Sequence, residues 1–264
     1  MVDVGALKRD LADEHESLDA FVASLDERGW DTPTPAEPWS VRDQIAHLAF
    51  FDDQAALAVL RPESFAESFQ QIAADVGTFM DRSVTKGRSM HGSRVLGWWR
   101  EARTAMLEAV AGVEPGRRIP WFGPPMSPAS FISARIMETW AHGQDVADGL
   151  GRSRVSTHRL RHVAHIGVLA RRYSYETNGL TSPDGPVFVE LTGPGGEKWA
   201  WGEPVEERVT GPALDFCLVV TRRRNVADTD LAMNGRSARQ WMGIAQAYAG
   251  PPGEGRRPGQ FAKG

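Results

Sequence analysis

Residues 39–50 read WSVRDQIAHLAF, and this stretch sets the fold class of the first half of the chain. Ser40 stands directly before an apolar-periodic run, and Asp43 follows three residues later, which is the capping-box arrangement of a helix N-terminus. We therefore predict a helix from Ser40 to about Leu60. Apolar neighbours surround His47 in the middle of this helix, so its imidazole is expected to be at least half buried.

Further helices are predicted on both sides of this segment. The spacing of apolar residues indicates helices over residues 7–25 and 93–113, an extra helix between Pro62 and Gly87, and a long helix from Ser127 to about Gly149. Ser127 and Pro128 supply the N-cap and the first-turn proline of the long helix. Four main helices joined by loops predict a four-helix bundle over residues 1–152.

The pattern changes after Gly151, where shorter helices and alternating strands replace the long helices. We expect a helix over 157–175, strands over 187–191 and 198–201, a helix from Thr210 to about Arg223, a strand over 229–233 and a helix over 235–248. Residues 153–250 therefore predict a small α+β domain. Residues 251–264, which are rich in Pro, Gly and Arg, are expected to form a flexible tail.

The composition favours a folded protein that acts on a small molecule. The net charge is −4, and there is no dense basic stripe interleaved with aromatic residues, so we expect no nucleic-acid surface. No stretch approaches the ~20 apolar residues of a membrane span, and the N-terminus lacks a signal-peptide layout, which predicts a cytoplasmic protein. The single cysteine, Cys217, lies in an apolar run, which excludes an internal disulfide and a Cys-rich zinc site.

The last predicted helix of the bundle carries a polar stripe of Arg135, Glu138, His142 and Asp145. A carboxylate and an imidazole four residues apart can both reach one ion, although a solvent-exposed stripe has the same spacing. His47, taken alone, also fits a hydrogen-bonded core histidine. Together with Glu138 and His142 it would form a three-ligand metal site with open positions. Asp145 is either a residue that orients a histidine or a surface charge.

A second histidine stripe competes with this site. His158, His162 and His165 share one helix face, but three turns span roughly 10 Å at ~1.5 Å per residue, so one ion would hardly meet all three. Several arginines crowd the same helix and disfavour a bound cation. His15 and His91 have no partner in the sequence and are expected to be surface residues.

Read with their flanks, the ligand candidates resemble those of one known family. Residues 39–48, preceded by Pro33-Thr34-Pro35, resemble the first metal-binding helix of the DinB/YfiT-like superfamily, in particular its mycothiol-dependent maleylpyruvate isomerase branch. Residues 138–146 (ETWAHGQDV) are similar to the second metal helix of that branch. The resemblance implies a four-helix bundle in which His47, Glu138 and His142 bind one divalent metal ion, most simply zinc.

The resemblance extends more loosely to the second half. Residues 211–216 and the arginines after them are similar to the family's smaller, sterol-carrier-like α/β domain. It implies that a functional arginine corresponds to Arg223, and Arg135 is our second candidate for binding an anionic group. Mycothiol is the implied thiol, and the excess of arginine over lysine fits its actinobacterial origin. A metal ion can lower the pKa of a thiol and hold the thiolate beside an electrophile.

We therefore expect a metal-dependent, thiol-assisted isomerase or thiol transferase that acts on a small unsaturated or electrophilic metabolite. Two other functions need the same residues, namely a non-catalytic metal- or ligand-binding module and a hydrolase that uses a metal-bound water. The aromatic residues Trp98, Trp99, Trp121 and Phe122 indicate either an apolar lid over the site or part of the bundle core. We expect a monomer or a homodimer.

Overall fold

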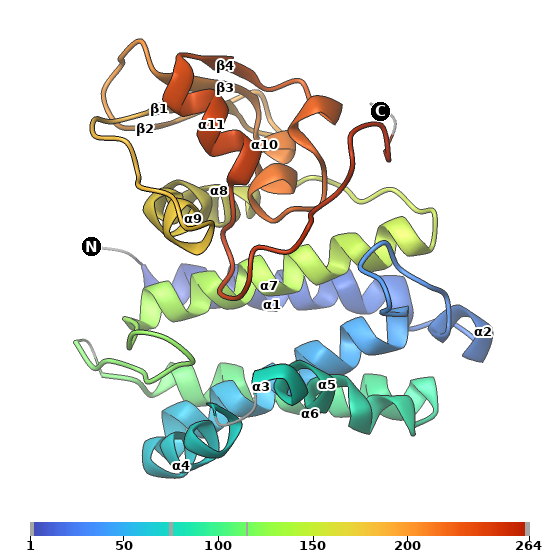
Figure 1. Cartoon of the computed structure of the whole chain (residues 1–264). Helices are drawn as coiled ribbons and strands as arrows, with labels where there is room; N and C mark the ends of the chain where they lie inside the picture. Colours follow the sequence, from blue (N-terminus) through green and yellow to red (C-terminus); the bar gives the residue numbers. More distant parts are fainter. Residues whose placement is uncertain (1–2, 74–75, 115, 262–264) are drawn as a thin grey trace. The chain divides into compact units, whose positions relative to one another are not determined.

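The chain folds into two compact units, Met1–Arg154 and Val155–Gly264. The computed structural model describes residues 3–73, 76–114 and 116–261 (Figure 1). The first unit is helical, and the second contains a small sheet. The division lies two residues after the boundary predicted from the sequence. Across the described ranges, no helix combines the length and the apolar character that crossing a membrane requires.

Long helices dominate the first unit (Figure 1). They are α1 (Val4–Val22), α3 (Val41–Leu60), α6 (Gly92–Ala111) and α7 (Pro128–Gly149). The shorter helices are α2 (Glu27–Trp30), α4 (Pro62–Ala73) and α5 (Val76–Arg88). Helix α3 packs against α6 and α7, and α1 packs against α7 and α6. The segment between Pro62 and Gly87, predicted to hold one extra helix, thus contributes two.

Both helices that carry ligand candidates begin at the predicted serine caps. At α3, the Ser40 hydroxyl accepts from the Asp43 backbone N–H, while the Asp43 carboxylate accepts from the Ser40 N–H at 3.1 Å. At α7, the Ser127 hydroxyl accepts from the Ser130 N–H at 3.1 Å. These caps satisfy backbone donors that a helix start leaves without partners, and they fix where each helix begins.

The interior of the helical unit has a polar layer between two apolar clusters. One cluster includes Leu7, Leu11, Ala55, Met106 and Ile136, and the other includes Leu18, Ile45, Leu48, Trp99 and Val146. Buried polar side chains lie between them along the helices: His15 on α1, Asp52 on α3 and Arg103 on α6. Buried charges are tolerated only when they are paired, so this layer demands specific partners.

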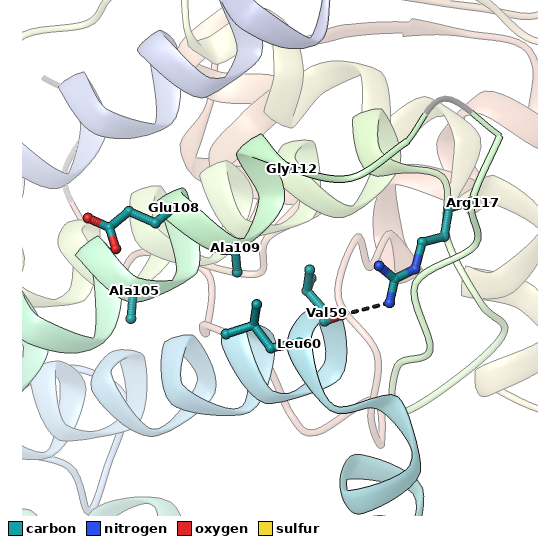
Figure 2. A pocket seen from close by; sticks show the side chains of 7 residues that line it. All are labelled: Val59, Leu60, Ala105, Glu108, Ala109, Gly112 and Arg117. Carbon is teal, nitrogen blue, oxygen red and sulfur yellow. Dashed lines mark hydrogen bonds between the residues drawn. The ribbon is translucent and has the colours of Figure 1, made fainter.

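A pocket of about 470 Å³ opens between the last turns of α3 and α6 (Figure 2). Its lining includes Val59, Leu60 and the small residues Ala105 and Ala109. The guanidinium of Arg117 closes one side and donates to the Val59 carbonyl at 2.7 Å. Val59 lies twelve residues after His47, or roughly 18 Å along the helix at ~1.5 Å per residue, so this pocket is separate from the ligand candidates.

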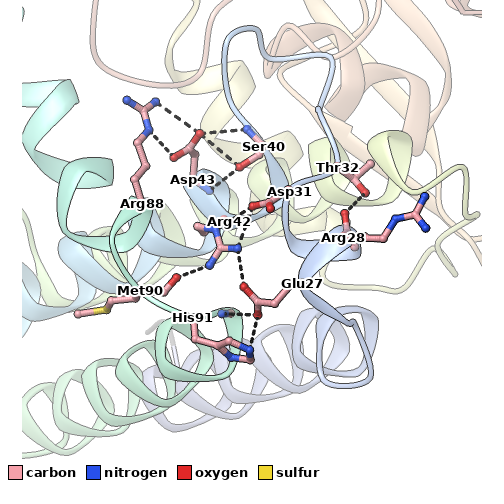
Figure 3. A network of polar contacts seen from close by, with 12 residues as sticks. Glu27, Arg28, Asp31, Thr32, Ser40, Arg42, Asp43, Arg88, Met90 and His91 are labelled. Carbon is pink, nitrogen blue, oxygen red and sulfur yellow. Dashed lines mark hydrogen bonds and ion pairs between the residues drawn. The ribbon is translucent and has the colours of Figure 1, made fainter.

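Arg42 anchors the first turn of α3 (Figure 3). Its guanidinium donates to the carboxylates of Glu27 at 2.9 Å and Asp31 at 2.8 Å, and also to the Met90 backbone carbonyl. These contacts tie α3 to α2 and to the connection between α5 and α6. The network therefore holds the first turn of α3 in place, and His47 lies in the second turn of the same helix.

The second unit is built on a four-stranded sheet with the order β2-β1-β3-β4. Its strands are β1 (Phe188–Thr192), β2 (Lys198–Trp201), β3 (Arg208–Pro212) and β4 (Ala232–Asn234). Strand β1 is antiparallel to β2 and parallel to β3, and β3 is antiparallel to β4. The helices are α8 (Leu160–Leu169), α9 (Arg171–Thr177), α10 (Ala213–Val220), the 3₁₀ turn η1 (Val226–Asp228) and α11 (Arg236–Ile244).

Several expectations for this unit are wrong in detail. The helix expected over 235–248 ends at Ile244, and the strand expected over 229–233 lies at Ala232–Asn234. The helix predicted over 157–175 is two helices, α8 and α9, which break at Ala170. Strand β3 was not predicted, because Thr210-Gly211-Pro212 was interpreted as a helix start, whereas these residues pair in parallel with β1 and α10 begins only at Ala213. Parallel strands are distant from each other in the sequence, so no local sequence pattern predicts that β3 pairs with β1.

The described part of the tail makes hydrogen bonds within the second unit. Asn225 donates to the Arg256 carbonyl at 3.0 Å, and the Gly259 N–H donates to the Asp228 carboxylate at 2.7 Å. The guanidinium of Arg224 lies over the ring of Phe261, 3.7 Å from its centroid. The predicted flexibility of this tail stays a prediction.

His15 lies in the polar layer, and the expectation that it is a surface residue is wrong. Its side chain is 1% exposed, and its ring meets Trp99 edge-on with 5.8 Å between centroids. Neither ring nitrogen has a hydrogen-bond partner among the residues that the structure describes. Burial, assisted by the charges of Arg103 and Arg135, holds the pKa of His15 well below its usual value. The imidazole is therefore neutral in the folded protein.

This neutral histidine predicts sensitivity to acid. Below pH ~6.5 the unfolded chain protonates His15 and the folded protein does not, so the free energy of unfolding falls as the pH falls, by up to about 1.4 kcal/mol per pH unit from this group. Urea unfolding of the wild type and His15→Phe between about pH 5 and pH 7.5 measures this. The variant should gain stability relative to the wild type as the pH falls, and a difference that does not change with pH would contradict the account.

Candidate metal centre

Three side chains of the helical unit that could hold a metal ion meet between α3 and α7. One ligand atom from each of His47, Glu138 and His142 can be chosen so that all lie within 4.8 Å of one another. His142 Nε2 lies 3.3 Å from Glu138 Oε2, and the two imidazole centroids are 4.5 Å apart. Within residues 3–73, 76–114 and 116–261, no other group of three such side chains comes this close. The structure thus brings together the residues that the sequence singled out.

The cluster is buried on its histidine side. His47 is buried, and the His142 side chain is 11% exposed, whereas the Glu138 side chain is 26% exposed. Glu138 and His142 are one helical turn apart on α7, and His47 faces them from the second turn of α3. Two imidazoles and one carboxylate are donors that suit zinc, and three protein ligands leave coordination positions for water or substrate.

Each histidine is held through its Nδ1 atom. Gln44 Oε1 lies 2.6 Å from His142 Nδ1, and Ser83 Oγ lies 3.1 Å from His47 Nδ1. A partner at Nδ1 orients the ring and leaves Nε2 for a metal ion. Neither partner was predicted from the sequence, which suggested only Asp145 for this role. Asp145 is fully buried on α7, and its part in orienting a histidine stays a prediction.

Signals for the two missed partners differ. Gln44 is a polar residue three positions before His47 on a face of α3 that is otherwise apolar, so its amide should have suggested a buried partner. Ser83 lies on α5, and only the packing of α5 against α3 brings its hydroxyl to His47. No sequence spacing indicates that contact.

Aromatic rings surround the two imidazoles. The Trp39 ring stacks on His142 with 6.0 Å between centroids, and the centroids of Trp39 and Phe51 lie 4.9 Å and 4.5 Å from that of His47. Phe51 in turn contacts Trp121 and Phe122. These rings make the neighbourhood of the cluster apolar, which strengthens electrostatic interactions within it.

The four aromatic residues considered as a lid therefore separate into two groups. Trp121 and Phe122 reach the neighbourhood of His47 through Phe51. Trp99 belongs to the core and donates its indole N–H to Asp52 at 3.2 Å. Trp98 is half-buried and donates to Asp53 at 2.7 Å.

Arg135 is buried in an ion pair with Asp52. Its Nε and Nη2 atoms lie 3.0 Å and 2.8 Å from Asp52 Oδ1, and both side chains are almost completely shielded from solvent. Burial raises the pKa of the Asp52 carboxyl, while the Arg135 guanidinium and the Trp99 N–H act in the opposite direction. The pair joins α7 to α3 one turn away from Glu138. The predicted role of Arg135 in binding an anion stays a prediction, and its guanidinium is occupied by Asp52.

Arg223 belongs to the second unit. It follows α10 directly after Arg222, whose φ of 62° is in the left-handed region. Its Nη1 atom donates to the Thr221 carbonyl at 2.7 Å, and the side chain is half-buried. Its predicted role toward a substrate stays a prediction.

The competing histidine stripe does not form a comparable cluster in the part of the chain that the structure describes. His165 accepts a hydrogen bond from the Trp201 indole at 3.1 Å. Burial is the main cause that lowers the pKa of His165, and the nearby His162 and Arg161 act in the same direction. Cys217 is buried as expected, and burial raises the pKa of its thiol.

Comparison with known proteins adds to this geometry. A family model described as the mycothiol maleylpyruvate isomerase N-terminal domain matches residues 11–147, and a model described as wyosine base formation matches residues 183–234. Uncharacterized proteins from two strains of Mycobacterium tuberculosis are each 46% identical to this chain over 257 residues, which cover 97% of this chain and 100% of the relatives.

Two crystal structures are similar in fold. They are those of the mycothiol-dependent maleylpyruvate isomerase and of a mutant of it, with TM-scores of 0.56 and 0.59. The identities are 13% and 11%, and each match covers 84% of this chain and 90% of the other. At these identities, the matches show a shared fold.

The buried ion pair yields a prediction about stability. Asp52→Asn leaves the Arg135 guanidinium buried without its counter-charge, so the free energy of unfolding should fall by about 3–5 kcal/mol. Asp53→Asn is the matched control, because Asp53 also accepts from a tryptophan but lies nearer the surface; its cost should be about 1 kcal/mol or less. Urea unfolding measures both, and equal losses would contradict a specific role for the pair.

Proposed function

The chain belongs to the mycothiol maleylpyruvate isomerase N-terminal domain family, and we propose that it is a divalent-metal enzyme that uses a small thiol. The proposed reaction is isomerisation of, or thiol transfer to, a small unsaturated or electrophilic metabolite. The convergence of His47, Glu138 and His142 carries this proposal. Family membership supports mycothiol as the thiol.

The donor set fits one zinc ion. His47 and His142 each have an Nδ1 partner, so their Nε2 atoms are the proposed ligand atoms, and the Glu138 carboxylate is the third ligand. A bound ion would act as a Lewis acid that lowers the pKa of the thiol and holds the thiolate beside the electrophile. Trp39 and Phe51 limit the access of water to the two imidazoles.

The proposed isomerisation involves no net oxidation or reduction of the substrate or of the thiol. The thiol sulfur adds to one carbon of a conjugated double bond, the resulting single bond rotates, and departure of the sulfur restores the double bond. We propose that Arg223 binds an anionic group of the substrate, because a guanidinium is a permanent cation with several donors. A small carboxylate with a conjugated double bond suits both the addition of the thiol and binding by the Arg223 guanidinium.

Metal content tests the site. Elemental analysis of the purified protein should find about one divalent ion per chain, and His47→Ala and His142→Ala should lose most of it, because each removes one of three ligands. His158→Ala and His162→Ala are matched controls from the competing stripe and should keep the wild-type content. Undiminished metal in both ligand variants would refute the site.

Thiol dependence tests the reaction. The zinc-loaded protein should convert maleylpyruvate or a related conjugated acid only when mycothiol is present. Arg223→Gln should lower kcat/KM by roughly 10–100-fold, as expected for the loss of a charge-assisted hydrogen bond, while the neighbouring Arg224→Gln stays near the wild type. Conversion that is equally fast without thiol would contradict the proposal and favour a hydrolase. Failure of the loaded protein to bind mycothiol would favour a non-catalytic binding module.

A further inference from the structure

A buried chain of hydrogen bonds runs from the backbone of Trp39 to the ring of His142. Thr34 Oγ1 lies 2.7 Å from the Trp39 carbonyl oxygen and 2.9 Å from Gln44 Nε2, and Gln44 Oε1 lies 2.6 Å from His142 Nδ1. Thr34 and Gln44 are 3% and 0% exposed. Solvent therefore offers these groups no alternative partners, and the direction of each hydrogen bond depends on its neighbours.

The direction is set at the Trp39 end. A carbonyl oxygen only accepts, and two oxygens 2.7 Å apart repel each other unless a hydrogen lies between them, so the Thr34 hydroxyl donates to Trp39. The Thr34 hydroxyl has only this one hydrogen, so toward Gln44 its Oγ1 atom accepts a hydrogen bond from the amide NH₂. This fixes the amide with its oxygen toward His142. Because that oxygen only accepts, the hydrogen at the 2.6 Å contact belongs to His142 Nδ1.

We propose that Thr34 and Gln44 are positioning residues that hold His142 in its Nδ1–H tautomer before any metal ion arrives. The lone pair of Nε2 is then available for the ion on the side where Glu138 lies. The inference rests on the proposed metal site. We call the chain of hydrogen bonds from Trp39 through Thr34 and Gln44 to His142 the relay. The test observes which nitrogen of one neutral ring carries the hydrogen in the metal-free protein, so that a failure to bind zinc and a failure of the relay are distinguishable.

Glu138 makes the outcome informative. Its carboxylate lies 3.3 Å from His142 Nε2 and, in the metal-free protein, favours a hydrogen on Nε2. The relay favours the opposite tautomer. Without the relay, a flipped Gln44 amide could donate to Nδ1, and the Nε2–H tautomer would then occupy the position that the ion needs.

The segment that carries Thr34 is itself held firmly. The Thr34 N–H also donates to the Trp39 carbonyl at 2.8 Å, and the Val41 N–H donates to the Thr32 carbonyl at 3.0 Å. At the end of α7, a Cβ atom on Gly149 would lie 2.8 Å from the Pro33 carbonyl oxygen, so α7 approaches this segment closely. The segment of residues 32–39 thus connects the start of α3 to the end of α7, the two helices that supply the proposed ligands.

The test is the nitrogen-15 spectrum of the metal-free, histidine-labelled protein at about pH 8.5, with the His142 signals assigned by comparison with His142→Gln. Two-bond proton–nitrogen correlations distinguish a ring nitrogen that carries hydrogen from one that does not. The wild type and Thr34→Ser, which keeps the hydroxyl, should show the Nδ1–H tautomer. Thr34→Val should shift the population toward Nε2–H.

Two further variants separate the relay from general damage. Thr32→Val removes a hydroxyl that donates to the Arg28 carbonyl in the same segment but outside the relay, and it should leave the His142 tautomer unchanged. In the double variant Thr34→Val, Gln44→Glu, the carboxylate has no NH₂ group to present to His142, so Nδ1–H should return even without the Thr34 hydroxyl.

Zinc affinity, measured by competition with a chelator, should follow the tautomer. Thr34→Val should bind zinc roughly 10–100-fold more weakly than the wild type, the usual range for the loss of an outer-shell partner, and Thr34→Ser should restore binding. An Nε2–H tautomer in the wild type would overturn the inference. So would a Thr34→Val protein that is folded and has the wild-type tautomer and zinc affinity.

Discussion

The register of α3 against α7 is the constraint on which the site depends, since His47 lies on one helix and both Glu138 and His142 on the other. The buried ion pair of Asp52 and Arg135 joins the same two helices one turn away from Glu138. A shift of one residue along either helix would rotate at least one of these three side chains away from the cluster by about 100°. The polar layer therefore specifies an alignment that apolar packing alone would leave less defined.

Much of the helical unit could be predicted from the sequence because its signals are local. The caps at Ser40 and Ser127 and the spacing of apolar residues fix where α3 and α7 begin. Elements that depend on distant partners were harder to predict. Strand β3 has few apolar residues of its own and pairs in parallel with β1, which is distant in sequence. The break between α8 and α9 falls at Ala170, which is itself a good helix former, and the nearby Gly167 lies inside α8.

The candidate site shows the same division between local and distant information. The i, i+4 spacing of Glu138 and His142 is visible in the sequence, but only the family resemblance connected them with His47. The partners of the two imidazoles, Gln44 and Ser83, were not predicted, since they reach the rings through contacts between helices. His15 was misplaced for the converse reason: nothing near it in sequence indicates that Trp99 covers it.

We propose that this fold positions two imidazoles and one carboxylate for a single divalent ion. Anomalous X-ray diffraction from crystals of the zinc-loaded protein, collected on both sides of the zinc absorption edge, locates that ion. We expect one strong anomalous peak between His47 Nε2, His142 Nε2 and the Glu138 carboxylate. Absence of a peak there, or a zinc peak at the His158 and His162 stripe instead, would refute the site.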